Sequence, residues 1–421
     1  MNSAAALHAF IAERNPAARR AWFVPGRIEV LGKHTDYAGG RSLLCAIERG
    51  FHLVAAPRGD GLVKLTDPER GIEATLPMDD SLPQAPGHWT AYPRVVIRRM
   101  TRHFPAARRG ADLAFSSNLP AAAGISSGTA LLIAVFLALA AVNDLEDDRA
   151  YRDAIGSRED LAGFLACIEN GYAFGPFGGD HGVGTAGGSE DHTAILCCER
   201  NRLAVYSFNP VRHERTVAID PGLRFVVASS GIVAEKAGGA RDAYNRASIA
   251  TQQILEIWNR ATGRNDPTLA AAVKSSADAP ATLRDILRQD RSSANEYLCG
   301  RFDQFYAESE EFVTAAADRL AAQDYPRFGQ IVDRSQQLAE RLLGNQVPQT
   351  IDLARSARQL GALAASAFGG GFGGSVWALV RAASADPFLE GWAAAYRRAY
   401  QDAAARATFF STAAGPAAAE I

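Results

Sequence analysis

The stretch LPAAAGISSGT, residues 119–129, leads directly into an apolar segment that ends at Val142 and predicts a buried helix. Its small residues let the backbone approach an anion closely, and the first turn of the helix offers unpaired N–H groups and the positive end of the helix dipole. The hydroxyls of Ser126, Ser127 and Thr129 are suited to phosphate oxygens or a magnesium ion. Because the stretch lacks the lysine of a P-loop, an ordinary serine-rich helix N-cap is the alternative interpretation.

Composition places the chain among ordinary globular proteins. Its 421 residues are enough for two domains. Hydrophobic residues make up 48%, charged residues 21%, and the formal net charge is −2, so neither nucleic acid nor a membrane surface is the expected partner. The apolar run Ala130–Val142 is too short to span a bilayer, and the N-terminus does not resemble a signal peptide. Five scattered cysteines match no zinc or disulfide pattern, which predicts a cytoplasmic protein.

The pattern of apolar residues predicts an α+β chain in two parts. Strands and helices alternate in the first half, and the second half is richer in helix. Expected strands include Trp22–Val24, Ile28–Val30 and Ile195–Cys198, and a helix is expected over Ser157–Ala173 with its first residue as N-cap. The two parts divide near residues 210–221.

A polar loop, PGRIEVLGKHTDYAGG at residues 25–40, lies between two of the expected strands. Its glycines free the backbone, and Lys33, His34 and Asp36 are close enough to point into one small volume. Such a mixture of donors and acceptors suits a ligand with many hydroxyl groups. A solvated turn is the alternative, because turns favour the same residue types.

Two further stretches are rich in glycine. Residues 171–188 precede Glu190 and Asp191, either of which is a candidate general base. Upstream, Glu169 falls on the apolar stripe of its helix, where a carboxylate is costly unless paired. The nearby histidines and cysteines fit no common zinc motif. The second stretch, FGGGFGGS at residues 368–375, precedes a strand and by itself marks only a turn.

Together, these segments resemble the GHMP kinase superfamily, and most closely its galactokinase branch. Three motifs occur in the family's order: residues 25–40 resemble the galactokinase signature, residues 119–127 the phosphate-binding motif and residues 369–374 the third motif. The resemblance spans roughly residues 20–380, and an ordered set is far more specific than one motif. Smaller similarities lie at Trp89 and Tyr92, at Glu169 and Asn170, over residues 184–191, and at Tyr244 and Asn245.

The resemblance implies a fold and a reaction. An N-terminal α/β domain, similar to the ribosomal-protein domain 2-like fold, would cover residues 1–215, and a ferredoxin-like domain residues 216–421, with the site in the cleft between them. The γ-phosphoryl group of ATP would pass to a sugar hydroxyl, in galactokinases the anomeric one, to give a sugar 1-phosphate and ADP. Positioning and charge neutralisation dominate such catalysis.

The resemblance also implies roles for individual residues. Asp191 would accept the hydroxyl proton, and Arg27 would stabilise the developing charge. Magnesium would be held by Ser127 and Glu169, although a salt bridge to a buried arginine would also explain Glu169. Sugar contacts would come from Lys33, His34, Asp36, Tyr37 and Tyr244. ATP contacts would come from Trp89, Gly124, Ile125, Ser126, Ser127, Gly128 and Thr129.

The chain departs from the galactokinase pattern at four places. Lys33 stands where galactokinases carry a glutamate that contacts the 6-hydroxyl of the sugar. Glu190 and His192 flank Asp191 in place of an apolar residue and a glutamine, Gly128 replaces a third serine, and residues 171–182 form an insertion.

Lys33 leaves the substrate open. It is suited to pair with the carboxylate of a uronic acid, or the sugar is a pentose such as arabinose with no C6 group. Alternatively, Lys33 bridges a neighbouring acid such as Glu190 and the sugar is a neutral hexose such as galactose. A sugar and ATP sensor without effective catalysis, or a kinase of another GHMP branch, stays an alternative, and the protein is expected to be a monomer or a homodimer.

Overall fold

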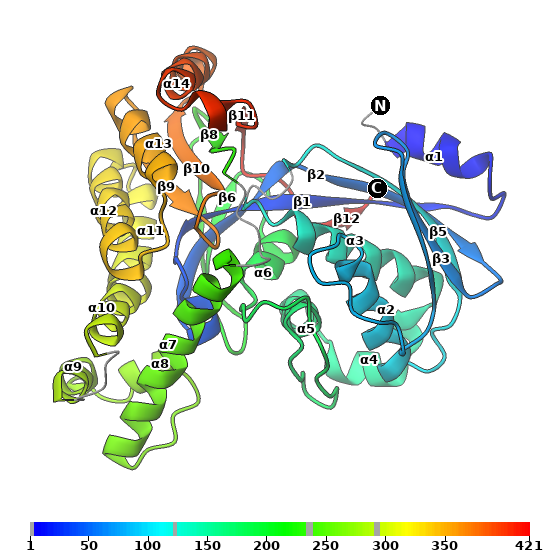
Figure 1. The fold of residues 1–421 in the computed structure, drawn as a ribbon, viewed down its shortest axis with the longest axis horizontal. Coiled ribbons are helices and arrows are strands. Elements are labelled where there is room, and N and C mark those ends of the chain that lie inside the picture. Colours follow the sequence, from blue (N-terminus) through cyan, green and yellow to red (C-terminus); the bar gives the residue numbers. More distant parts are fainter. Residues whose placement is uncertain (1–3, 121–123, 233–238, 290–294) are drawn as a thin grey trace.

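The computed structural model describes residues 4–120, 124–232, 239–289 and 295–421. They form one sheet of eight strands and one of four strands, with helices packed against both (Figure 1). In this described part of the chain, no helix is both long and apolar enough to cross a bilayer. The mixture of helices with two separate sheets confirms the α+β class.

The larger sheet is organised around one long strand, β2, which pairs with β1, β5 and β6. The strand order is β12-β1-β2-β5-β3-β4, and β7 pairs with β6 at a branch. β3 and β5 are parallel, whereas the other pairs are antiparallel. The strands are β1 (Arg20–Leu31), β2 (Arg41–Arg58), β3 (Leu62–Asp67), β4 (Ile72–Pro77), β5 (Gly110–Ser117), β6 (Arg202–Ser207), β7 (Arg212–Ala218) and β12 (Ala419–Glu420).

Helices cover both faces of this sheet. α3 packs against β1, β2 and β5 on one face and against α2, α5 and α6 on its other sides, which explains why it is apolar all round. α1 covers the opposite face, where Leu7 and Ile11 contact Val54 and Ala114. The helices are α1 (Ala4–Ala12), α2 (Ala91–His103), α3 (Ser127–Val142), α4 (Arg149–Ala154), α5 (Arg158–Asn170) and α6 (Glu190–Cys197).

The smaller sheet is antiparallel with the order β11-β8-β10-β9, and both of its faces are covered. Successive residues of a strand point to opposite faces. Accordingly Val227 and Trp377 join the main core with α11 and α12, whereas Val226 and Val376 join a second core with α13 and α14. The strands are β8 (Leu223–Ser229), β9 (Ala364–Phe368), β10 (Ser375–Arg381) and β11 (Thr408–Thr412).

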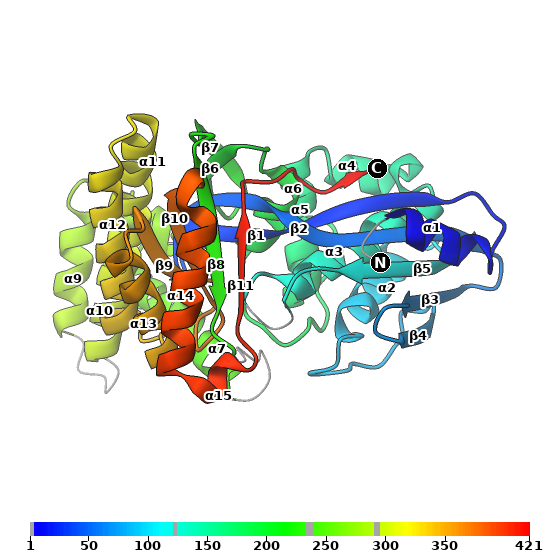
Figure 2. The same ribbon diagram turned by 90° about the horizontal axis from the view of Figure 1, so that it is seen from above.

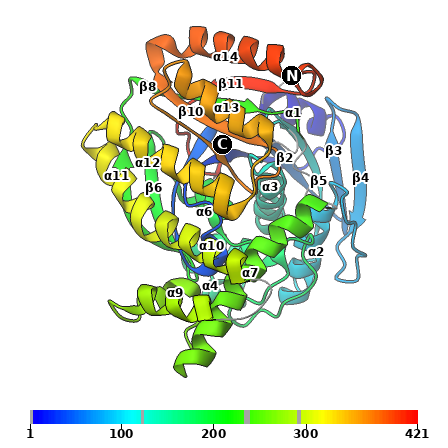
Figure 3. The ribbon, with the colours of Figure 1, turned by 60° about the vertical axis from the view of Figure 1, so that its left-hand side comes forward.

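The helices of the second half pack against one another and against the two faces of the smaller sheet. α9 and α10 pack against α7 (Figure 3), and two turns of π-helix, η3 and η4, flank α11 and α12. The segments are α7 (Gly239–Thr262), α8 (Leu269–Val273), α9 (Ala279–Gln289), α10 (Asn295–Tyr306), η3 (Ala307–Phe312), α11 (Val313–Ala321), α12 (Tyr325–Leu338), η4 (Ala339–Leu343), α13 (Pro348–Gln359), α14 (Ala385–Ala399) and α15 (Gln401–Ala404).

The chain leaves the larger sheet at Ala218 and enters the smaller one at Leu223. Its last segment then runs back from β11 to pair with β1 (Figure 2), so the two ends of the chain share the larger sheet. The division into domains at residues 215 and 216 stays a prediction.

Some expectations for secondary structure are confirmed and others are wrong. The buried helix ending at Val142 is present, and Ser157 caps α5, accepting a hydrogen bond from the Asp160 backbone N–H at 3.0 Å. The two short strands expected before residue 31 are one strand, β1, with a register shift between Pro25 and Arg27. The strand expected at Ile195–Cys198 is wrong, because these residues end helix α6. A short apolar run by itself fits either element.

Candidate active site

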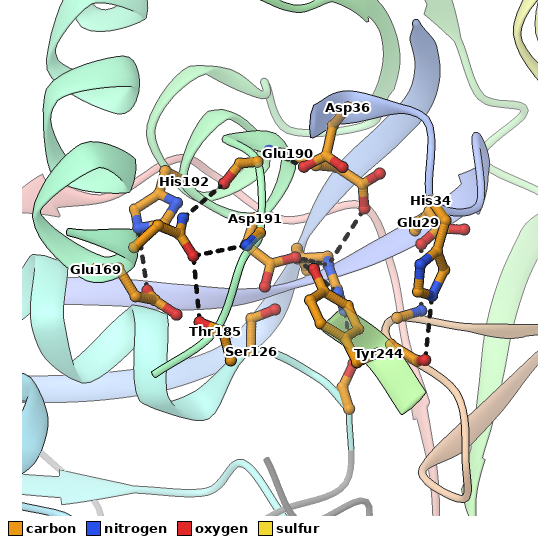
Figure 4. Close-up of a pocket in the computed structure, with 17 residues that line it drawn as sticks. Glu29, His34, Asp36, Ser126, Glu169, Thr185, Glu190, Asp191, His192 and Tyr244 are labelled. Atoms are coloured by element: carbon orange, nitrogen blue, oxygen red, sulfur yellow. Dashed lines mark hydrogen bonds and ion pairs between the residues drawn. The ribbon is translucent and has the colours of Figure 1, made fainter. Parts of the chain in front are cut away.

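The glycine-rich stretches and the polar loop, far apart in the sequence, meet in one cleft. Its lining comes from β1, the loop before β2, the start of α3, helices α5, α6 and α7, and the loop between β9 and β10 (Figure 4). The described residues that line it are Arg27, Glu29, His34, Asp36, Gly124, Ser126, Glu169, Asn170, Thr185, Gly187, Gly188, Glu190, Asp191, His192, Tyr244, Gly369 and Gly370.

Arg27 and Asp191 form an ion pair at the centre of the cleft. The guanidinium donates from Nε to Asp191 Oδ1 at 2.7 Å, and Nη2 lies 2.7 Å from the same oxygen. A third nitrogen, Nη1, donates to the Gly124 carbonyl at 2.7 Å, which ties the pair to the candidate phosphate loop. Burial opposes the charge on Arg27, but Asp191, Glu190 and Glu29 outweigh it and raise the Arg27 pKa. Arg27 therefore carries a permanent charge.

Asp36 lies against the N-terminus of α6. Its Oδ2 accepts a hydrogen bond from the Glu190 N–H at 3.1 Å, and burial raises the pKa of this carboxyl. The close approach depends on Gly188, because a Cβ there would lie 2.3 Å from Asp36 Oδ2. The carboxyl of Glu190 accepts from Ser42 Oγ at 2.9 Å, and burial together with Glu29 raises its pKa well above the ordinary value.

His34 is held as a neutral ring. Burial, reinforced by the charge of Arg301, lowers its pKa to about 3. Its Nε2 lies 3.1 Å from the Gly370 carbonyl and its Nδ1 lies 2.9 Å from the Tyr37 hydroxyl. A carbonyl only accepts, so Nε2 carries the proton and Nδ1 accepts from Tyr37. Tyr244 packs its ring 5.1 Å from that of His34. Tyr37 is thus a support for His34 rather than part of the lining.

The candidate phosphate loop is described from Gly124, and its residues 121–123 lie outside the described part of the chain. Gly124 and Ser126 line the cleft, whereas Ile125 is buried and Ser127 begins α3. The hydroxyls of Ser126 and Thr129 are buried and have no hydrogen-bond partner among the described residues. Such groups are costly to bury unless a ligand completes them.

Gly128 and Trp89, both expected to contact ATP, are not part of the described cleft lining. A Cβ on Gly128 would come within 2.2 Å of the Tyr92 ring, so the glycine accommodates the packing of α2 against α3. Trp89 packs on Phe115 with ring centroids 6.0 Å apart and does not line the cleft in the described structure. Its expected contact with ATP stays a prediction.

Glu169 has a partner that neither sequence alternative named. Its Oε2 lies 3.1 Å from His192 Nε2, and both side chains are buried. The contact joins α5 to α6 and gives the Glu169 carboxylate a polar neighbour within the cleft lining. Among the described residues, no three His, Cys, Asp or Glu side chains gather as a metal site.

Two of the expected sugar contacts, Tyr37 and Lys33, lie outside the described cleft lining. The Lys33 side chain is 1% exposed and turns away from the cleft into the second half of the chain. Nζ donates to Ser335 Oγ at 2.9 Å and lies 3.9 Å from Glu308 Oε1. Lys33 therefore bridges an acid, as one alternative held, but the acid is Glu308 instead of Glu190.

Sequence reasoning missed two acidic residues of this region. Glu29 lies two residues after Arg27 on β1, so the period of two along a strand indicated that both face the cleft. Glu308 gave no such signal, because it reaches the polar loop only through the π-helical turn η3. Its Oε1 accepts from the N–H groups of Gly32 at 2.8 Å and Lys33 at 3.3 Å.

Comparison with known proteins agrees with this arrangement. The galactokinase galactose-binding signature matches residues 8–57, the GHMP kinases N terminal domain residues 91–188, and the GHMP kinases C terminal domain residues 316–398. The galactokinase of Chloroflexus aggregans is 27% identical over 88% of this chain and 86% of its own length. That of Lacticaseibacillus paracasei is 26% identical over 94% of both chains.

Solved structures share the fold. The structure of Lactococcus lactis galactokinase complexed with galactose matches with a TM-score of 0.81, at 22% identity over 99% of both chains. L. major mevalonate kinase in complex with R-mevalonate matches with a TM-score of 0.56, at 15% identity over 96% of this chain and 97% of its own.

The two-domain fold, the matched segments and the cleft that joins them define the class: the chain belongs to the GHMP kinases. Within that class it is a galactokinase-like sugar kinase, an enzyme whose small-molecule substrates are a sugar and ATP.

Proposed function

We propose that the enzyme transfers the γ-phosphoryl group of ATP to the anomeric C1 hydroxyl of a neutral hexose of the galactose type. Its similarity to galactokinases over most of the chain supports the reaction. The observation that carries the proposal is the Arg27–Asp191 pair, 2.7 Å apart, in which Arg27 of the polar loop also donates to the Gly124 carbonyl of the candidate phosphate loop.

In this proposal Asp191 is the base. It accepts the proton of the C1 hydroxyl while that oxygen forms a bond to the γ-phosphorus and the bond from that phosphorus to the β–γ bridging oxygen breaks, releasing ADP. Arg27 holds the Asp191 carboxylate in place and presents a fixed positive charge to the transferring group. Asp36, neutral His34 and Tyr244 would contact the sugar, and the buried hydroxyls of Ser126 and Thr129 the phosphates.

The electrostatics of the cleft favour a neutral sugar over a uronic acid. Among the described lining residues, five carry carboxyl groups and Arg27 alone carries a permanent positive charge. A sugar carboxylate would find there a single permanent cation that is already paired with Asp191, and would be repelled by the carboxyl groups that are ionised. The uronic acid hypothesis required Lys33 to face the sugar, and its contacts with Ser335 and Glu308 remove that support.

The residues present fit a magnesium ion bound together with the nucleotide. Mg²⁺ is usually held by one or two carboxylates and by substrate phosphates. Glu169 supplies a carboxylate to the cleft, and Ser126 supplies a buried hydroxyl that no described residue pairs, whereas Ser127, the serine expected from the sequence, does not line the cleft. We therefore propose Glu169 with Ser126 or Ser127 as the protein ligands. Bound there, the ion would neutralise phosphate charge.

The proposal is tested by measuring ADP release with galactose, galacturonic acid, glucuronic acid and arabinose, followed by ³¹P NMR of the product. We expect galactose to be turned over best and to give a C1 phosphate ester. Turnover of a uronate above galactose, or a phosphate on another carbon, would contradict it. Retained sugar and ATP binding without turnover of any sugar would instead identify a sensor.

A further inference from the structure

Glu29 is a buried carboxyl of the cleft that the proposed chemistry does not use. Its side chain comes from β1, is 2% exposed and lines the cleft (Figure 4). Arg27, two residues earlier on the same strand, lines the cleft as well. Oε2 accepts a hydrogen bond from the Gly369 N–H at 3.2 Å. Oε1 is buried and has no hydrogen-bond partner among the described residues.

Such an oxygen is costly to keep. A buried acceptor without a partner loses its hydrogen bonds to water and gains nothing in return. Burial raises the pKa of Glu29 to about 7, although Lys33 and Arg27 partly oppose the shift. Arg27 is already shared between Asp191 and Gly124, and the nitrogen of Lys33 donates to Ser335. The charged neighbours of Glu29 therefore leave Oε1 available to a ligand.

Glu29 supplies the cleft with an acceptor that position 33 does not supply. A lysine ammonium group only donates, and the Lys33 side chain is turned toward Ser335 and Glu308, so position 33 offers the sugar no acceptor. Glu29 offers one from β1, where the Gly369 N–H holds its other oxygen, and it lines the same cleft as His34 (Figure 4). A site built around a buried acceptor rejects a substrate that lacks the matching donor, because the acceptor is then left unpaired.

We propose that Glu29 is a specificity-determining residue: its Oε1 accepts a hydrogen bond from a hydroxyl or amino donor on the sugar, other than the reacting C1 hydroxyl. The proposal rests on the proposed function and names which protein group selects the substrate. It predicts that the deoxy sugar lacking the hydroxyl recognised by Glu29 is a poor substrate. It also predicts that an amine at that carbon is tolerated, whereas a carboxylate is not.

The test is a comparison of Glu29→Gln with the wild type on galactose and on its 2-, 3-, 4- and 6-deoxy derivatives. Gly369 N–H needs an acceptor, so the amide oxygen of Gln takes the place of Oε2 and its NH₂ group stands where Oε1 was. The variant thus presents a donor instead of an acceptor. Measured well above pH 7, where a carboxyl with a pKa of about 7 is ionised, kcat/KM for galactose should fall by roughly ten- to a hundredfold, the effect of a hydrogen bond to a charged group.

The deoxy sugars supply the matched control. One of them should already be poor with the wild type and should lose little more with Glu29→Gln, which is the non-additive result expected for two directly interacting groups. The KM for ATP should not change. An equal loss for galactose and all four deoxy sugars would overturn the proposal and make Glu29 a structural residue.

Two further sugars test the donor requirement if the sensitive hydroxyl is at C2 or C6. Galactosamine carries an amine at C2 and should still be a substrate, whereas galacturonic acid carries a carboxylate at C6 and should not. Glu29→Asp, which retains the charge but withdraws it by one methylene, covers the case in which Glu29→Gln does not fold. Calorimetric titration of the same sugars is run in parallel. An inactive wild type would overturn the proposed function, whereas binding that discriminates among the deoxy sugars through Glu29 would still support this inference.

Discussion

Arg27 and Lys33 are two buried cations of one strand-and-loop segment with opposite surroundings. Arg27 pairs with Asp191 inside the cleft, and Lys33 pairs with Glu308 and Ser335 outside it, against the helices of the second half. Arg27 and Asp191 both line the cleft, so a bound ligand is able to contact either of them. The partners of Lys33, in contrast, lie outside the cleft and fix the position of the polar loop. Burial by itself therefore says nothing about which charge meets the substrate.

The largest effect is expected from removing the proposed base. Asp191→Asn should lower kcat by roughly 10²–10⁴-fold, the usual contribution of a general base. The variant should stay folded, because Asn keeps the shape of the side chain and Arg27 Nη1 still donates to the Gly124 carbonyl. Rates of ADP release and urea denaturation of the same preparations check both statements. Normal turnover by the variant would remove Asp191 from the mechanism.

Breaking the Lys33 pair should instead cost stability. Lys33→Met leaves Glu308, which is fully buried, without its cation, and removing one partner of a buried pair typically destabilises by about 3–5 kcal/mol. The double variant Lys33→Met with Glu308→Gln should recover much of that loss. Urea denaturation of the single and double variants tests this. A shift in sugar preference with unchanged stability would place Lys33 in the substrate site after all.

The neutral state of His34 should make stability depend on pH. Its pKa is lowered to about 3 in the folded chain, so below its ordinary value of 6.5 the unfolded chain binds the proton and the folded chain does not. Stability from this group is complete above pH 6.5 and is lost as the pH falls, by about 2 kcal/mol between pH 8 and pH 5. Urea denaturation at a series of pH values measures the effect. His34→Asn should lose this dependence relative to the wild type, and the exposed His213→Asn should keep it.

The smallest effect is expected at Gly128. Gly128→Ser introduces the hydroxyl that the resemblance to galactokinases leads us to expect at this position, yet its Cβ would meet the Tyr92 ring. The ring is only partly buried and is able to move, so we expect a loss of about 1 kcal/mol in urea denaturation, at the low end for overpacking. The double variant with Tyr92→Ala should show a smaller additional cost for the serine. Tighter ATP binding by the single variant would instead indicate that position 128 faces the cleft, as Arg27 does, and not only the packing of α2 against α3.

Local patterns predicted the membership of the site better than they predicted its electrostatics. The order of the three motifs indicated that His34, Asp36 and the phosphate loop belong to one site, because each motif is a continuous segment with its own backbone requirements. The smaller similarity over residues 184–191 added Asp191. The partners of Glu169 and Lys33 could not be predicted in this way. His192 reaches Glu169 only through the packing of α6 on α5, and Glu308 reaches Lys33 only through a π-helical turn.

The sequence by itself determined the family, the α+β class and most of the cleft lining, because those depend on short motifs and on periodicities that a single segment carries. Only the tertiary structure decided which charged groups face the ligand. That choice depends on contacts between segments hundreds of residues apart, such as Ser335 with Lys33 and Gly369 with Glu29. These contacts direct the Lys33 side chain away from the cleft. They also leave one oxygen of Glu29, a residue of the cleft lining, without a hydrogen-bond partner among the described residues.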